Sequence, residues 1–213
     1  MGACRATRLP TPTTARGAAT RARIVEAAAE LVAARGVTGT TLEDVLDASR
    51  TGKSQFYSHF ANKDALMLAV VNAQSERFLG FQAFRLSEVN SLESLRQWRD
   101  QIVTLFQASR GTGGCLIGCL ASALADRSEE TRELLTESFQ RWESHLLAAL
   151  RSMQVHGILS ASADPRGLSM AVACALQGGL LLAQMIRSIQ PLEIALDMAL
   201  DHISAHSVHA ESI

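Results

Sequence analysis

Apolar residues recur at three- and four-residue intervals along almost the whole chain, and this period constrains the fold more than any other feature of the sequence. Near the N-terminus, Ile24, Ala27, Ala28, Leu31 and Val32 fall on one side of a helix. No stretch alternates apolar and polar residues as a half-buried strand does. The chain has only four prolines and is rich in alanine and leucine, which favours helices over sheets. The sequence therefore predicts an all-α protein.

Capping and helix-ending residues divide this pattern into separate helices. Gly36 is placed to end the first helix, and Thr40 and Glu43 have the spacing of a capping box. Asn62 is expected to cap the helix that follows it, and Asp164 followed by Pro165 is a strong helix start. The predicted helices cover about 20–35, 42–48, 53–60, 62–85, 92–109, 114–126, 128–156, 165–190 and 191–207. From this pattern we divide the chain into a disordered arm (1–19), a first domain (20–66), a second domain (67–207) and a tail (208–213).

The net charge of −1 conceals a difference between the two ends of the chain. Residues 1–72 carry nine Lys or Arg against six Asp or Glu, a balance of +3, whereas residues 73–213 carry eleven against fifteen, a balance of −4. A basic part on an acidic body is typical of a protein that binds a polyanion through the basic part.

Residues 168–186 contain no charge and are long enough to span a bilayer. Gln177, Gln184 and the pair Gly178-Gly179 interrupt this run, and a helix that is apolar all round is also what a buried or dimer-interface helix looks like. The N-terminus lacks the apolar core of a signal peptide. We therefore expect a cytoplasmic protein that does not enter a membrane.

The four cysteines lack paired C-x-x-C spacing, which argues against a zinc ribbon and against a disulfide framework. His202, His206 and His209 can face one way near the C-terminus, but they lack a fourth ligand. We expect neither a metal nor a cofactor.

Two short helices joined by a tight turn, within a cluster of three helices, form a helix-turn-helix. In the second short helix, Phe56 and Phe60 are four residues apart and can anchor one face to the core. Ser54, Gln55 and Tyr57 then point elsewhere, toward a groove of DNA.

Residues 40–66, TTLEDVLDASRTGKSQFYSHFANKDAL, resemble the DNA-binding head of the TetR (tetracycline-repressor) family. The match runs without a gap through a threonine pair, an acidic-apolar helix, a turn and the positions Lys53, Phe56, Tyr57, His59, Phe60, Lys63, Asp64, Ala65 and Leu66. The resemblance implies an N-terminal three-helix head that contains the helix-turn-helix, followed by a helical domain for ligand binding and dimerisation. It also implies a ligand-responsive transcriptional regulator, most simply a repressor, that binds palindromic operator DNA as a homodimer.

Side-chain chemistry divides the expected DNA contacts into two kinds. Gln55 can make a bidentate contact to adenine and Ser54 can contact several bases, whereas the others suit phosphate oxygens. The expected contacts are Thr40, Thr41, Arg50, Lys53, Ser54, Gln55, Tyr57, His59 and Lys63. Packing remains an alternative for Tyr57, and a solvated face or a cap interaction remains one for His59 and Lys63.

The turn between the two short helices departs from the family pattern. Arg50 occupies a position that is usually glycine, and Thr51 one that is usually apolar. Either Arg50 takes a costly left-handed conformation or Gly52 absorbs the bend.

By the same resemblance, the last two predicted helices form a four-helix dimer interface with their copies. Ala171, Ala175, Gly178 and Gly179 are small enough for close helix approach, either across that interface or within one chain. The implied effector pocket is lined by residues such as Trp98, Phe106, Cys115, Cys119, Trp142 and Gln177, with Met153 and Met185, although most of these can equally be plain core.

The segment 113–135 is similar to a branch of the family that responds to electrophiles and oxidants. Cys115 lies in the first turn of a predicted helix, where the helix dipole favours a thiolate, and Cys119 lies one turn later. An alternative function is therefore a thiol-sensing repressor that acts through Cys115. The other interpretation is that both cysteines are small buried hydrophobic residues.

An enzyme and a helical adaptor are the rival classes. The glycine-rich stretch 110–114 lacks the preceding strand that a dinucleotide or phosphate site needs, and we see no catalytic set of side chains. An adaptor would leave the series of Thr, Lys, Tyr and His residues unexplained, so we expect a DNA-binding regulator and not an enzyme.

Overall fold

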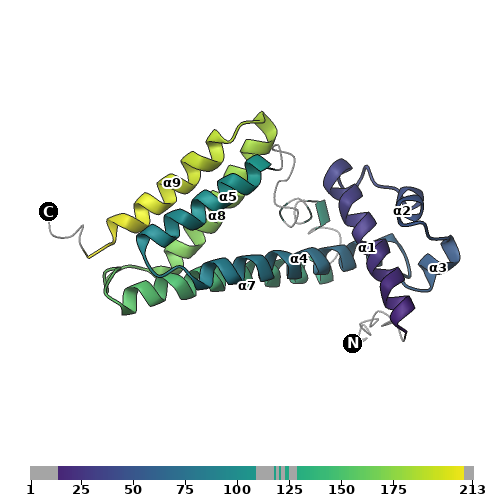
Figure 1. Ribbon diagram of the computed structural model, residues 1–213, viewed down its shortest axis with the longest axis horizontal. Coiled ribbons are helices and arrows are strands. Elements are labelled where there is room, and N and C mark those ends of the chain that lie inside the picture. Colours follow the sequence, from purple (N-terminus) through teal and green to yellow (C-terminus); the bar gives the residue numbers. More distant parts are fainter. Residues whose placement is uncertain (1–13, 109–117, 119, 121–122, 125–128, 209–213) are drawn as a thin grey trace. The chain divides into compact units, whose positions relative to one another are not determined.

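The computed structural model describes residues 14–108, 118, 120, 123–124 and 129–208. In these residues the regular structure is helical, with one isolated bridge between Leu159 and Ser207. The helices are α1 (Ala15–Arg35), α2 (Leu42–Ser49), α3 (Lys53–Tyr57), α4 (Lys63–Ser87), α5 (Leu92–Ala108), α7 (Glu129–Val155), α8 (Pro165–Ile186) and α9 (Gln190–Ala205) (Figure 1). The predicted all-α fold class is confirmed.

Helix ends fall where the local sequence supplies a cap. Gly36 adopts a φ of 74° and its N–H bonds the Val32 carbonyl at 2.8 Å, which ends α1. Asn62 accepts the Ala65 N–H at 2.8 Å at the start of α4, and Asp164 accepts the Arg166 N–H at 3.1 Å at the start of α8. These capping roles were predicted from the sequence and are confirmed.

Three predicted helix boundaries were wrong. The short helix that begins at Lys53 ends at Tyr57, with Ser58 as its C-cap, and not near Phe60. The first helix begins at Ala15 and not at Thr20, because Thr14 is extended and its hydroxyl accepts the Gly17 N–H at 3.1 Å. The helix that begins at Pro165 ends at Ile186 and not near residue 190. There Arg187 turns into the left-handed region (φ 52°) and its N–H bonds the Ala183 carbonyl. The predicted helix 114–126 lies largely outside the described residues.

The chain divides into two compact units, Met1–Gln74 and Ser75–Ile213. In the first, α1 and α2 pack together around Ile24, Ala28 and Val45. In the second, the part of α4 from Ser75 to Ser87 lies alongside α7 (Figure 1), and the rings of Phe78 and Trp142 are 6.0 Å apart between centroids. Helix α8 packs against both α7 and α9.

Two adjacent glycines of α8 have different surroundings. A Cβ on Gly179 would lie 2.9 Å from the Leu192 Cα, so this glycine lets α8 and α9 cross closely. A Cβ on Gly178 would meet nothing within 4 Å. Two roles were expected for this pair, close helix approach within one chain or across a dimer interface. Of the two glycines, Gly179 alone has the first role.

Helix α8 carries two apolar faces. Leu168, Val172 and Leu176 point into the core of the second unit. Elsewhere on α8, chiefly toward its C-terminal end, and on α9, large apolar side chains are exposed: Leu181, Leu182, Met185, Ile186, Ile194 and Met198. We call these six residues the apolar surface of α8 and α9. Among the described residues, Pro165–Ile186 is also the one helix whose length and composition would suffice to cross a membrane.

Candidate functional site

The turn between α2 and α3 is built on Arg50, which adopts the left-handed conformation (φ 51°, ψ 47°). Its N–H bonds the carbonyls of Asp47 and Leu46 and thereby ends α2. Gly52 is extended, with a φ of −83°, and does not make the bend. Of the two conformations that the sequence allowed, the chain takes the costly one at Arg50.

Contacts on both sides hold this turn in place. The hydroxyls of Ser49 and Thr51, both buried, lie 2.6 Å apart. From α1, the Arg23 Nε donates to the Ser49 carbonyl at 2.9 Å. The sequence gives no sign of this tie, because the two residues are 26 positions apart.

Helix α3 has one buried face and one exposed polar face. Phe56 and Phe60 are buried with ring centroids 5.5 Å apart, and the Arg21 guanidinium lies over the Phe60 ring. Lys53, Ser54, Gln55 and Tyr57 are exposed, and Tyr57 retains 56 % of its accessible surface. The anchoring role of the two phenylalanines is thus confirmed. The Tyr57 ring lies edge-on to that of Phe56, with centroids 5.3 Å apart, so the tyrosine packs in part and is exposed in part.

The cap at the start of α2 differs from the prediction by one residue. Thr41 and Asp44 form the capping box, not Thr40 and Glu43. Hydrogen bonds from the Thr41 hydroxyl and backbone N–H hold the pKa of Asp44 below its ordinary value. Thr40 is fully buried and its hydroxyl donates to the Gly36 carbonyl at 2.9 Å, so it fixes the loop before α2 and does not face solvent.

Lys63 is half-buried, and its Nζ donates to the carbonyls of Val37 and Thr40. A cap interaction was the alternative considered for this lysine, and these bonds to backbone carbonyls resemble one. His59 is also half-buried, and its ring lies 6.5 Å from that of Phe60. Lys53 has an exposed partner, with its Nζ 3.5 Å from the Glu43 carboxylate, a contact that holds the side chain weakly in water.

The residues expected to line an effector pocket separate into four groups. Trp98, Phe106 and Met153 are buried in the core of the second unit, where the Trp98 indole N–H donates to the Gln82 Oε1 at 3.1 Å. Met185 is exposed on α8. Cys115 and Cys119 lie outside the described residues. Trp142 and Gln177 together line one cavity.

This cavity, of about 440 Å³, lies between α7 and α8, and we call it the α7/α8 pocket. Its two walls combine apolar and polar side chains: Thr136, Phe139, Gln140, Trp142, Glu143, Met170, Ala173, Cys174 and Gln177. Glu143 is buried and accepts a hydrogen bond from the Ser169 hydroxyl. Sequence reasoning gave no role to Cys174 or Glu143, because only the crossing of α7 and α8 brings them together.

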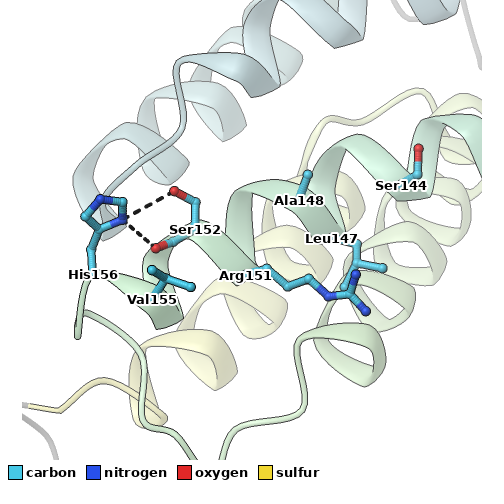
Figure 2. Close-up of a pocket in the computed structure, with 7 residues that line it drawn as sticks. All are labelled: Ser144, Leu147, Ala148, Arg151, Ser152, Val155 and His156. Atoms are coloured by element: carbon cyan, nitrogen blue, oxygen red, sulfur yellow. Dashed lines mark hydrogen bonds between the residues drawn. The ribbon is translucent and has the colours of Figure 1, made fainter.

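A second hollow, of about 540 Å³, runs along the C-terminal half of α7, and all its lining residues lie between Ser144 and His156 (Figure 2). Within it, the His156 Nδ1 is 2.7 Å from the Ser152 carbonyl oxygen. A hollow lined by a single helix and its C-terminal end encloses a ligand poorly compared with a cleft between two helices.

Two family profiles match the chain. One, described as "Bacterial regulatory proteins, tetR family", covers residues 24–70, which include α2 and α3. The other, described as "Transcriptional regulator LmrA/YxaF-like, C-terminal domain", covers residues 91–198, slightly more than half of the chain.

Individual relatives agree with the profiles. The repressor NemR of Escherichia coli K12 is 28 % identical over 185 residues, which are 83 % of this chain and 90 % of NemR. A regulator of Lactococcus lactis encoded in the lacX 3′ region is 28 % identical over 187 residues, 84 % of this chain and 90 % of that protein.

Solved structures share the fold. A regulatory protein TetR from Rhodobacter sphaeroides superposes with a TM-score of 0.76 at 25 % identity, covering 86 % of this chain and 98 % of that one. The reduced form of E. coli NemR superposes with a TM-score of 0.74 at 26 % identity, covering 88 % and 98 % of the two chains.

Proposed function

The chain belongs to the TetR family of bacterial transcriptional regulators, and we propose that it binds a palindromic operator through α3 and the start of α2 as a homodimer. It is a ligand-responsive regulator and not an enzyme. The proposed operator contacts rest on one observation. Phe56 of α3, with Phe60 just after the helix, is buried, whereas the polar side chains of α3 are exposed.

Each exposed side chain has a role that its chemistry supports. Gln55 and Ser54 read base edges in the major groove. Lys53, Tyr57 and Arg50, with the Thr41 end of α2, contact phosphates and fix the register of the protein on DNA. Lys63 acts chiefly by holding the loop before α2, through its bonds to Val37 and Thr40.

Homodimerisation is proposed on the apolar surface of α8 and α9. A cluster of large exposed apolar side chains on two adjacent helices marks an interaction surface, and the open position of Gly178 leaves room for a partner helix. A two-fold dimer would present two α3 helices to two half-sites about one helical turn, or a small multiple of it, apart. The same face accounts for the apolarity of α8 in a cytoplasmic protein without any membrane.

The operator proposal is tested by selecting bound sequences from random DNA and titrating the best of them at several salt concentrations. We expect a palindromic site and a slope of log K against log salt of about −0.9 for each phosphate contact. DNA binding that is absent, or that does not depend on salt, would refute the proposal.

The dimer proposal is tested with Met198→Glu, which places a charge in the apolar surface of α8 and α9. We expect a monomer in analytical ultracentrifugation and much weaker operator binding. Val155→Glu is the matched control, because Val155 is 83 % exposed on α7 and lies outside that surface. Dissociation by both substitutions, or by neither, would show that these six residues do not form the interface.

Thiol sensing through Cys115 is not favoured as the function. Cys115 lies outside the described residues, whereas the cavity between α7 and α8 supports a ligand in the second unit.

A further inference from the structure

The α7/α8 pocket contains two N–H donors that lack acceptors. Trp142 is fully buried, and its indole Nε1 has no hydrogen-bond partner in the part of the chain that the structure describes. The same holds for the Nε2 of Gln177, a residue of α8 that lines the same pocket. Buried polar groups are nearly always paired, so each such exception calls for an explanation.

Trp98 shows that the fold can pair a buried indole when the indole is only structural. Its N–H donates to the Gln82 Oε1 at 3.1 Å, within the same unit. Trp142 is equally buried and borders a cavity, and no described residue accepts its N–H. An acceptor supplied from outside the chain would remove the cost of the open donor.

Electrostatics limits the charge of that acceptor. Glu143 is buried, lines the cavity and accepts a hydrogen bond from the Ser169 hydroxyl. No lysine or arginine lines the cavity among the described residues. An anionic ligand would lose its hydration without gaining a cation and would face the Glu143 carboxylate, which makes binding unfavourable.

We propose that the α7/α8 pocket binds an uncharged, largely apolar molecule that carries a carbonyl-type acceptor, and that Trp142 and Gln177 donate to that acceptor. Phe139, Met170 and Ala173 supply the apolar walls. A volume of about 440 Å³ lies within the range of small-molecule sites. This inference rests on the proposed ligand-responsive function and adds the chemical class of the effector.

Three probes of similar size and shape separate the contributions: acetophenone, which is neutral and has a carbonyl; ethylbenzene, which lacks the acceptor; and benzoate, which is anionic. The chain has only two tryptophans, so a protein labelled with nitrogen-15 gives two indole N–H resonances, assigned with Trp142→Phe. We expect acetophenone to move the Trp142 indole proton downfield and to leave that of Trp98 unchanged, because Trp98 is already paired. Ethylbenzene should produce no downfield shift, and benzoate should not bind.

Gln177→Leu tests the second donor, and we expect it to weaken acetophenone binding several-fold to about tenfold. Gln184→Leu makes the same change two turns later on α8, outside the pocket, and should leave the affinity unchanged. The proposal is overturned if acetophenone moves neither indole or both, if the three probes bind alike, or if the two glutamine variants behave alike.

Operator titration of the same proteins separates this inference from the proposed function. Gln184→Leu, which lies outside the pocket, should bind DNA without any probe as the wild type does. Salt-dependent operator binding without the indole shift would refute the proposed ligand class and leave the proposed function standing. If the probe shifts the indole resonance but the protein binds no DNA, the proposed operator binding is refuted and the proposed ligand class still holds.

Discussion

Replacing Arg50 by glycine should make the protein more stable and, at the same time, make its binding to DNA less dependent on salt. Arg50 holds the left-handed conformation that turns α2 into α3, and its side chain is exposed beside the polar face of α3. The substitution removes a backbone strain and a charge together, and these two effects appear in different measurements.

The change in stability follows from two opposing contributions. An L-residue in the left-handed region costs about 1–2 kcal/mol relative to the right-handed one, and glycine removes this cost. Glycine also gives the unfolded chain more freedom, which costs roughly 0.5–1 kcal/mol. The net expectation is an increase of about 0.5–1 kcal/mol in the free energy of unfolding. On DNA, the loss of one phosphate contact should reduce the slope of log K against log salt by about 0.9.

Arg187 provides a matched control. It is the other non-glycine residue with a positive φ among the described residues (52°), and it ends α8 in the second unit. Arg187→Gly should therefore raise the free energy of unfolding by a similar amount without changing the salt slope. Urea unfolding at a fixed protein concentration and anisotropy titrations from roughly 50 to 200 mM salt give the two readouts. If Arg50→Gly keeps the wild-type slope, Arg50 does not contact phosphate; if neither variant is stabilised, the account of strain is wrong.

Three further changes test the operator contacts, the cap of α2 and the crossing of α8 with α9. Gln55→Ala should remove about 1–3 kcal/mol of discrimination at one base position, and an equal loss on every operator variant in a titration series would contradict a reading role. Asp44→Ala should destabilise the protein at neutral pH, and the difference from wild type should vanish in acid. Folding lowers the pKa of Asp44, so its carboxylate stabilises the fold above the unfolded pKa of about 3.9. This stabilisation is lost as the pH falls through the folded pKa. Urea unfolding at a series of pH values checks this, and a difference that persists well below pH 3 would exclude the charge of Asp44 as its cause. Gly179→Ala should lower the free energy of unfolding, because overpacking costs about 1–3 kcal/mol against a gain in helix propensity of about 1 kcal/mol, whereas Gly178→Ala should not; equal effects in urea unfolding would refute the assigned crossing.

Features that depend on neighbours in the sequence could be predicted from the sequence. The caps at Asn62 and Asp164 and the stop at Gly36 each require one side chain or one glycine within a few residues of the helix end. The anchoring pair Phe56 and Phe60 follows from helical spacing alone. These local rules placed the helix-turn-helix correctly.

Choices between equivalent local solutions could not be predicted in the same way. Thr40 with Glu43 and Thr41 with Asp44 have the same spacing, and the Gly36 carbonyl decides between them by taking the Thr40 hydroxyl. For Lys63, the carbonyls of Val37 and Thr40 lie more than twenty residues away along the chain. The pattern indicated a cationic side chain near the DNA but not the loop that it holds.

The pocket residues were the least predictable part of the site, because identical residue types serve different purposes. Trp98 and Trp142 are both buried in helices of the second unit, yet Gln82 pairs one indole and a cavity borders the other. Helical spacing predicts that a tryptophan is buried, but it does not predict whether the indole N–H has a hydrogen-bond acceptor. That distinction depends on long-range contacts and could not be read from residue type.

The composition of α8 illustrates how one sequence feature can support two structures. A run of apolar residues without charge is compatible with a membrane span, but the residues of α8 fall on two faces. Leu168, Val172 and Leu176 are covered within the chain, whereas Leu181, Leu182 and Met185 are not. A single chain in water would leave this second face exposed, at a cost of roughly 25 cal/mol for each Å² of apolar surface. A second copy of the same helix pair would bury that face, and the open position of Gly178 would allow the two copies of α8 to approach closely. If the proposed dimer places two α3 helices on one operator, the apolarity of α8 is better explained by dimerisation than by a membrane.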